Sequence, residues 1–103
     1  MENIKLCIII PTYNNERTVV DMIRSVKEYC NDVIVVNDGS TDSTHERLLD
    51  CSIEGLHIIE YAQNKGKGHA LVKGFKKARE MGFTHAITID ADGQHYASDI
   101  PTL

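Results

Sequence analysis

Apolar residues in this chain form four short, nearly continuous runs, and longer segments with a helical repeat separate them. The runs predict strands at residues 4–10, 32–37, 56–60 and 86–89. The first two are almost wholly apolar, which is typical of strands buried on both faces of a parallel sheet. The third is more polar, so we expect it nearer an edge of the sheet.

The segments between these runs predict helices at about Glu16–Tyr29 and Asp42–Asp50, and a third helix after the loop 64–68. The first has apolar residues spaced four, three and four apart, which gives one apolar face. Leu48 and Leu49 are the expected apolar contacts of the second helix. The third helix is expected to end at Gly82, and its inner face comprises Leu71, Gly74, Phe75, Ala78 and Met81.

Three strand–helix units followed by a fourth strand predict a parallel sheet with right-handed crossovers. The predicted fold is therefore α/β, a Rossmann-like three-layer sandwich. The run 99–103 resembles a first helical turn.

Length and composition narrow the functional classes. The chain has 103 residues, enough for one domain, and its net charge of −4 does not suggest a nucleic-acid partner. No apolar run reaches the ~18 residues of a membrane span. The three cysteines match no zinc or disulfide spacing, which favours free thiols in a reducing cytosol.

The fourth run ends in residues that suit a metal ion. Asp90 and Asp92 are two positions apart, so in extended backbone their carboxylates point the same way, and Gln94 continues that parity. Three oxygen ligands suit Mg²⁺ or Mn²⁺, and phosphate oxygens commonly fill the remaining positions. An EF-hand loop is excluded because it requires a glutamate at its twelfth position, where this chain has Pro101. A pair of solvated aspartates is the simpler alternative.

The predicted topology places other polar residues close to this motif. Ligands of parallel sheets bind outside the carboxyl ends of the strands. The segments after strands one, two and four carry Tyr13, Asp38, Asp90 and Asp92, so these side chains should converge on one edge. The convergence predicts a site for the diphosphate of a nucleotide.

Four motifs, IIPTYNNE, VVNDGSTDST, NKGKGHA and ITIDADGQH, resemble those of the family-2 glycosyltransferases. The last motif is most similar to the polyprenyl-phosphate sugar transferases, which include dolichyl-phosphate mannosyltransferase. The resemblance implies a GT-A fold whose N-terminal half binds a nucleotide-diphosphate sugar, either UDP- or GDP-linked. It also implies inverting transfer to an acceptor such as a polyprenyl phosphate or a glycan.

The resemblance also implies roles for individual residues. Asp38 would accept a hydrogen bond from a base N–H, and Lys65 or Lys67 would approach the donor phosphates. Asp92 would be the principal metal ligand, with Asp90 nearer the ribose or donor sugar. Base and ribose would be framed by Pro11, Tyr13 and Glu16.

Members of that family are much longer than this chain. We therefore expect residues 1–103 to be the N-terminal nucleotide-sugar-binding half of a truncated GT-A domain, with any acceptor-side base beyond residue 103. Such a chain should bind donor weakly or not at all and should not transfer sugar. We also expect self-association through strand 86–89, which would be left as a sheet edge. The expected location is cytoplasmic, at the cytoplasmic face of the membrane in a full-length protein.

Three other functions compete with this one. A haloacid-dehalogenase-like phosphatase also has a strand followed by Asp-x-Asp-Gly, but it requires Thr or Val where Gln94 stands. A receiver-like signalling domain requires an aspartate at the end of its third strand, where this chain has Glu60 and Tyr61. A degenerate nucleotide-binding module without catalysis is the third.

Overall fold

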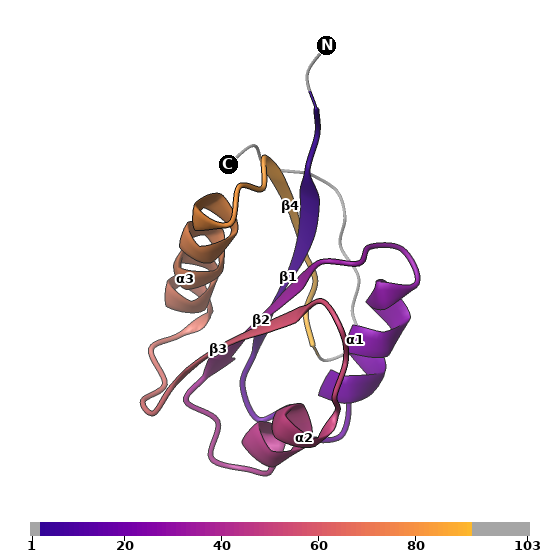
Figure 1. Ribbon diagram of the computed structural model, residues 1–103. Helices are drawn as coiled ribbons and strands as arrows, with labels where there is room; N and C mark the ends of the chain where they lie inside the picture. The colour runs from indigo at the N-terminus through magenta and orange to yellow at the C-terminus, as the bar shows by residue number, and fades with distance from the viewer. Residues whose placement is uncertain (1–2, 92–103) are drawn as a thin grey trace.

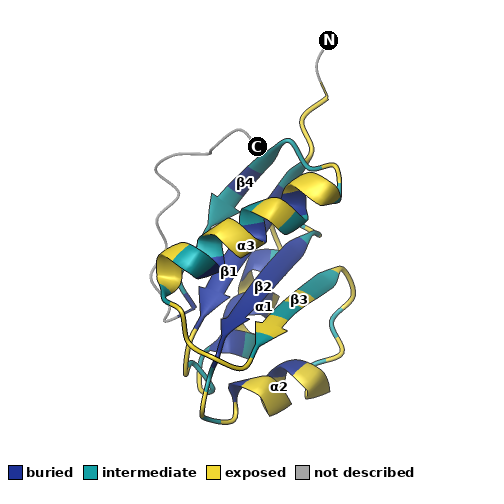
Figure 2. Cartoon of the chain, turned by 90° about the vertical axis from the view of Figure 1, so that its left-hand side faces the viewer, coloured by how far each residue is buried: buried dark blue, intermediate teal, exposed yellow. Residues whose placement is uncertain are grey.

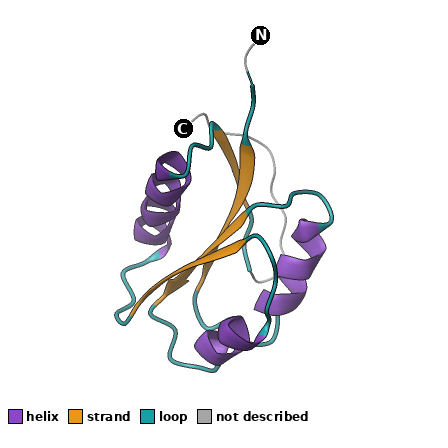
Figure 3. Cartoon of the chain, viewed as in Figure 1, coloured by secondary structure: helices purple, strands orange, loops and turns teal. Residues whose placement is uncertain are grey.

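Strands and helices alternate along the chain in a computed structural model that describes residues 3–91 (Figures 1 and 3). The predicted turn at 99–103 lies outside the described residues. The elements are β1 (Leu6–Thr12), α1 (Val19–Lys27), β2 (Val33–Asp38), α2 (Thr44–Asp50), β3 (Leu56–Tyr61), α3 (Lys67–Glu80) and β4 (His85–Thr88).

The four strands form one parallel sheet in the order β3-β2-β1-β4. Ile8 of β1 pairs with Val33 of β2 on one side and with Ile87 of β4 on the other. This arrangement confirms the predicted parallel sheet and the edge position of β3. Within the described residues β4 is the other edge strand, and self-association through it stays a prediction.

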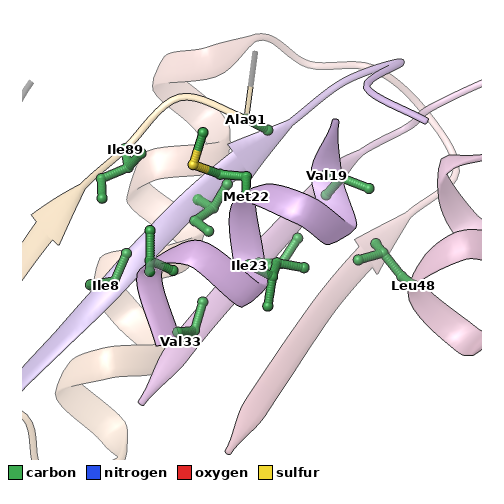
Figure 4. Packing of buried hydrophobic residues seen from close by; sticks show 11 residues of the cluster. Ile8, Val19, Met22, Ile23, Val33, Leu48, Ile89 and Ala91 are labelled. Atoms are coloured by element: carbon green, nitrogen blue, oxygen red, sulfur yellow. The ribbon is translucent and has the colours of Figure 1, made fainter. Parts of the chain in front are cut away.

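Helices cover both faces of the sheet, which confirms the three-layer architecture. Figure 1 shows α3 on one face and α1 with α2 on the other. Alternate residues of the central strands point to opposite faces, so Ile8 and Ile10 pack toward α1 (Figure 4) while Cys7 and Ile9 pack toward α3. Figure 2 shows the central strands as the most buried part of the chain.

β1 continues through Pro11 to Thr12, beyond the predicted end at Ile10. Proline has no N–H to donate, so it is tolerated where one side of a strand lacks a partner. The pairing of β1 with β4 runs from Leu6 to Ile9, and past that point β1 pairs only with β2 within the described residues. Pro11 thus lies where β1 is locally an edge.

Two helix predictions need correction. α1 begins at Val19 rather than Glu16, because residues 16–18 form a turn whose Thr18 N–H donates to the Asn15 carbonyl. In α2, Leu48 is buried as predicted, but Leu49 is 63% exposed. Leu48 shares its face with Thr44 four residues earlier, whereas Leu49 lies about 100° further round the helix.

α3 packs closely on the sheet because its inner face is made of small residues, Ala70, Gly74 and Ala78. A Cβ placed on Gly74 would lie 2.6 Å from Ile9 Cγ2. Gly82 follows the helix with φ of +88°, as expected of a glycine at a helix C-terminus. This close packing fixes the N-terminus of α3 at the carboxyl edge of the sheet.

Candidate functional site

A cavity of about 360 Å³ opens at the carboxyl edge of the sheet. Its wall comes from the end of β1, the end of β2, the start of α3 and the segment after β4. This is the edge at which parallel sheets bind ligands. The cavity is lined by Pro11, Thr12, Tyr13, Asn15, Asp38, Asn64, Gly66, Lys67, Ala70, Asp90 and Ala91.

Asn15 shapes the turn after β1. Its Oδ1 accepts hydrogen bonds from the Thr12 hydroxyl at 2.7 Å and from the Tyr13 N–H at 3.0 Å. The Tyr13 side chain remains 44% exposed on the cavity wall. An aromatic ring is therefore held at the end of β1, where it offers a flat apolar face to a ligand.

The turn after β1 is tied to the turn after β2. The Asn14 N–H donates to Ser40 Oγ at 2.9 Å, and the Thr41 N–H donates to Asn14 Oδ1 at 2.8 Å. Asn14 has φ of +53°, a region that asparagine enters more readily than most residues. The two loops therefore form one hydrogen-bonded unit beside the cavity.

Asp42 belongs to the same unit. Its Oδ1 accepts hydrogen bonds from the Thr44 hydroxyl at 2.6 Å and the Thr44 N–H at 2.9 Å, and its Oδ2 accepts one from the Glu16 N–H at 3.3 Å. Burial alone would raise the pKa of Asp42, but these hydrogen bonds together lower it below its ordinary value. Asp42 therefore serves as a charged anchor of this loop pair.

Asp38, at the end of β2, is only 3% exposed, and its carboxylate holds the loop before α3. Oδ1 accepts the Lys65 N–H at 2.8 Å, while Oδ2 accepts the Gly66 N–H and the Asn64 side-chain amide, both at 2.9 Å. A carboxylate can accept about four hydrogen bonds, so these three leave capacity for one more. Asp38 thus fixes the N-terminus of α3 in addition to lining the cavity.

Tyr61 lies beside Asp38 at the end of β3. Its hydroxyl is buried and has no hydrogen-bond partner of good geometry among the described residues. Burial raises the pKa of Tyr61 above its ordinary value, and the neighbouring Asp38 carboxylate raises it further. The ring edge meets the His69 ring at a centroid distance of 5.4 Å. Tyr61 therefore packs the strand end against α3 as a neutral phenol.

Asp90 contacts the start of α3 at the wall of the cavity. Its Oδ1 lies 2.5 Å from Nζ of Lys67, the first residue of α3. The next residue, Ala91, is 2% exposed, and its carbonyl accepts a hydrogen bond from the Thr18 hydroxyl at 2.5 Å. The chain after β4 is thus held between α1 and α3, with one carboxylate and one ammonium group at the cavity.

The structure brings together five of the residues predicted from sequence, since the cavity is lined by Pro11, Tyr13, Asp38, Lys67 and Asp90. Glu16 lines a neighbouring hollow of about 250 Å³ with Asp42. The Lys65 side chain is exposed, and it is the backbone N–H that contacts Asp38. Asp92 and Gln94 lie outside the described residues. The roles assigned to all these residues stay predictions.

Five lining residues, Thr12, Asn15, Asn64, Ala70 and Ala91, were not predicted as part of the site, and two of them show why. Asn64 lines the cavity and binds the Asp38 carboxylate, and Ala70 closes the wall from α3. The position of Asn64 in the loop after the third strand was the available signal, because that loop also lies at the carboxyl edge. The contribution of Ala70 could not be predicted, because a small apolar residue on the inner face of a helix is typical of any hydrophobic core.

Two observations concern metals and membranes. Among residues 3–91, no three His, Cys, Asp or Glu side chains are grouped closely enough to hold a metal ion. In the same part of the chain, no helix is both long and apolar enough to cross a membrane.

Comparison with known proteins gives consistent relatives. The chain is 35% identical over 108 residues to a UDP-N-acetylglucosamine–dolichyl-phosphate N-acetylglucosaminyltransferase of Methanococcus voltae, covering 90% of this chain and 43% of that protein. It is 33% identical over 116 residues to a dolichyl-phosphate beta-glucosyltransferase of Saccharomyces cerevisiae, covering 99% and 34% respectively. The chain thus spans less than half the length of these curated relatives.

A solved structure supports the fold. Glucosyl-3-phosphoglycerate synthase from Mycobacterium tuberculosis, in complex with phosphoglyceric acid, superposes with a TM-score of 0.67 at 23% identity, covering 87% of this chain and 34% of that one. This likeness confirms a GT-A type α/β fold. The sequence model described as Glycosyl transferase family 2 matches residues 7–103, nearly the whole chain. The match separates the chain from the phosphatase and receiver-domain alternatives, and the chain belongs to glycosyl transferase family 2.

Proposed function

We propose that the cavity at the carboxyl edge binds the nucleotide part of a nucleotide-diphosphate sugar, UDP- or GDP-linked, for inverting transfer of the sugar. The observation that carries the proposal is the meeting of Tyr13, Asp38 and Asp90 in one cavity, from three separate strand ends. Tyr13 offers a ring face to the base, and Asp38 retains acceptor capacity for a base N–H. Asp90 stands on the opposite wall, where the ribose or the sugar diphosphate would lie.

The acceptor that we propose is a polyprenyl phosphate. The two curated relatives described above carry names of dolichyl-phosphate sugar transferases, which supports this acceptor over a glycan. A lipid phosphate acceptor would bring the protein to the surface of a membrane, and the side that we propose is the cytoplasmic face. In the N-terminal domain proposed here, the described side chains would bind and orient the donor.

A divalent cation, Mg²⁺ or Mn²⁺, fits the chemistry of this wall. The Asp90 carboxylate already holds a cationic group, the Lys67 ammonium, at the cavity. Carboxylate oxygens suit a hard divalent cation, and Asp92 and Gln94 follow at the spacing of further ligands. When bound, such a cation would neutralise charge on the leaving nucleoside diphosphate.

In this proposal the Lys67 ammonium group pairs either with the Asp90 carboxylate or with the phosphate oxygens of the donor. While it is paired with Asp90, its ammonium group neutralises the carboxylate that we assign to the metal. With a cation held by Asp90, the exposed Lys67 side chain would be free to pair with phosphate oxygens of the donor. Lys67 is the better placed of the two loop lysines, because it lines the cavity and the Lys65 side chain does not.

Binding is best tested by titration observed in amide NMR spectra, because this method detects weak complexes. We expect UDP- or GDP-sugars, added with Mg²⁺, to shift the amide signals of Tyr13, Lys65 and Gly66. Asp90→Asn should weaken binding, whereas Asp50→Asn, an equal change on the exposed end of α2, should not. Shifts confined to residues outside the cavity would overturn the proposal.

Metal dependence and base preference need a separate measurement. Calorimetry with UDP-, GDP- and dTDP-sugars, with and without Mn²⁺, should show one preferred base and tighter binding with the metal. Equal binding of all three donors with and without Mn²⁺ would contradict the assignment. A radiolabelled transfer assay to polyprenyl phosphate should give product with a family member as long as the curated relatives and none with this chain. Robust turnover by the chain would refute the domain assignment.

A further inference from the structure

The charges of this chain are strongly segregated along the sequence. The segment 65–82, which contains α3, has six Lys and Arg residues and a single acidic residue, Glu80, a net charge of +5. The other 85 residues carry five basic and fourteen acidic residues, a net charge of −9. A chain that is acidic overall therefore presents one strongly cationic element, α3.

Three cations of α3 lie on its outer side. Ala70, Gly74 and Ala78 face the sheet, while Lys73, Lys76 and Arg79 are exposed. Figure 2 shows α3 lying across one face of the sheet, with its exposed positions turned outward. None of these three cations forms an ion pair within the described residues. Their charge is therefore available to a partner.

An exposed apolar residue lies among these cations. Val72 is 51% exposed and shares a stripe of the helix with Lys76 and Arg79, four and seven positions later. Both of the exposed aromatic residues in the described part of the chain, Tyr13 and Tyr29, lie outside α3, and the rings of α3, His69 and Phe75, are partly buried. The outer face of α3 therefore offers no exposed ring on which a base could stack. A convex surface of long cationic side chains around one apolar contact suits a planar anionic surface better than a nucleic-acid groove.

We propose that the outer face of α3, namely Val72, Lys73, Lys76 and Arg79, binds the anionic lipid headgroups of a bilayer. The inference rests on the proposed function, because a lipid phosphate acceptor would bring the protein to a membrane. Lysine and arginine stems lie along such an interface while their charged ends bind phosphates. Because α3 begins at the cavity, docking on this face would hold the donor site close to the bilayer surface.

Co-sedimentation with vesicles tests the inference without donor or transfer. The chain should bind vesicles that contain about one third phosphatidylglycerol and should not bind pure phosphatidylcholine. Each cation near an anionic surface strengthens binding by about fivefold at low salt, so Lys73→Gln, Lys76→Gln and Arg79→Gln together should weaken it by roughly a hundredfold. Salt at about 0.15 M should weaken wild-type binding as well.

A matched control removes the same charge from the opposite face. Arg17→Gln, Arg24→Gln and Arg47→Gln together change three exposed arginines beside or within α1 and α2. This control should retain most of the binding, and an equal loss in both triple variants would overturn the proposal. Binding to a DNA duplex as tight as binding to vesicles would also overturn it. Failure of vesicle binding would leave donor binding by NMR unaffected, so the two proposals fail separately.

Discussion

The contact between α3 and the sheet at Gly74 gives a prediction whose magnitude follows from the structure. A Cβ at this position would lie 2.6 Å from Ile9 Cγ2 and 3.4 Å from Val36 Cγ2. Carbon atoms in contact prefer about 3.5–4.0 Å, so Gly74→Ala requires the helix to shift by about 1 Å or Ile9 to leave its position. Ile9 is fully buried at the centre of β1 and has little room to move.

Two opposing terms determine the result. Replacing glycine by alanine inside a helix favours folding by about 1 kcal/mol. Forcing an extra methyl group into a packed core costs about 1–3 kcal/mol. We therefore expect Gly74→Ala to be destabilised by about 0–2 kcal/mol overall.

Gly68 supplies the matched control on the same helix. A Cβ at Gly68 meets nothing within 4 Å. Gly68→Ala should therefore gain up to about 1 kcal/mol from helix propensity without any cost of packing. The two variants should differ by about 1–3 kcal/mol, because the packing term is the one that separates them.

Urea unfolding followed by circular dichroism measures this difference directly. The midpoint for Gly74→Ala should lie below that for Gly68→Ala by on the order of 1 M. Equal midpoints, or a higher midpoint for Gly74→Ala, would refute the reasoning that a close helix–sheet contact holds α3. If α3 is pushed outward, Lys67 moves with it, so the same variant should also weaken the ion pair with Asp90.

Three further predictions concern Asp38, Cys7 and Lys67. Asp38→Asn should lower the free energy of unfolding by about 2–3 kcal/mol, because a neutral amide replaces the charged carboxylate that accepts the Lys65 and Gly66 N–H groups. The same variant should speed hydrogen exchange at these two amides. Unchanged exchange would contradict the role of Asp38 in holding the loop before α3. Burial, and to a smaller extent the neighbouring Cys30 and Asp32, raises the pKa of the Cys7 thiol from its ordinary 9.0 to about 11. The thiol therefore ionises at lower pH in the unfolded chain than in the folded one. The contribution of Cys7 to the free energy of unfolding is complete below about pH 9 and should be lost as the pH rises toward 11. Urea unfolding at about pH 8 and about pH 10.5 should show a smaller decline for Cys7→Ala, and an equal decline would exclude this cause. Lys67→Gln should bind Mn²⁺ a few-fold more tightly in calorimetry, because the Lys67 ammonium group no longer competes with the metal for the Asp90 carboxylate. The exposed ion pair that is lost is worth up to about 1 kcal/mol. Weaker binding would show instead that the ammonium group supports the metal site.

The strands could be predicted from sequence because their apolar runs are short, continuous and bounded by polar turns. The start of α1 could not, since residues 16–18 are compatible with a helix by composition alone. They form a turn because Asn14 and Glu16 bond to Ser40 and Asp42, far away in sequence. Contacts of this kind are decided by tertiary packing and leave no local pattern.

The candidate site divides in the same way. Topology was sufficient to bring Tyr13, Asp38 and Asp90 to one edge, because the carboxyl ends of parallel strands meet there. The hydrogen bonds that Asp38 makes could not be predicted, because its partners lie 26 to 28 residues later in a loop without secondary structure. The Lys67–Asp90 ion pair could not be predicted from sequence either, since its formation depends on the position of the α3 N-terminus relative to the end of β4.

The strand order has a consequence for how the chain is made. β1 emerges from the ribosome first, yet the strand that covers its second side, β4, is synthesised nearly eighty residues later, as the pairing of Leu6 with His85 shows. β1, β2 and β3 can associate while synthesis continues, but one side of β1 stays uncovered until β4 appears. Asp90 follows shortly after β4, so the nascent chain acquires the Asp90 wall of its cavity only after β4 has been synthesised.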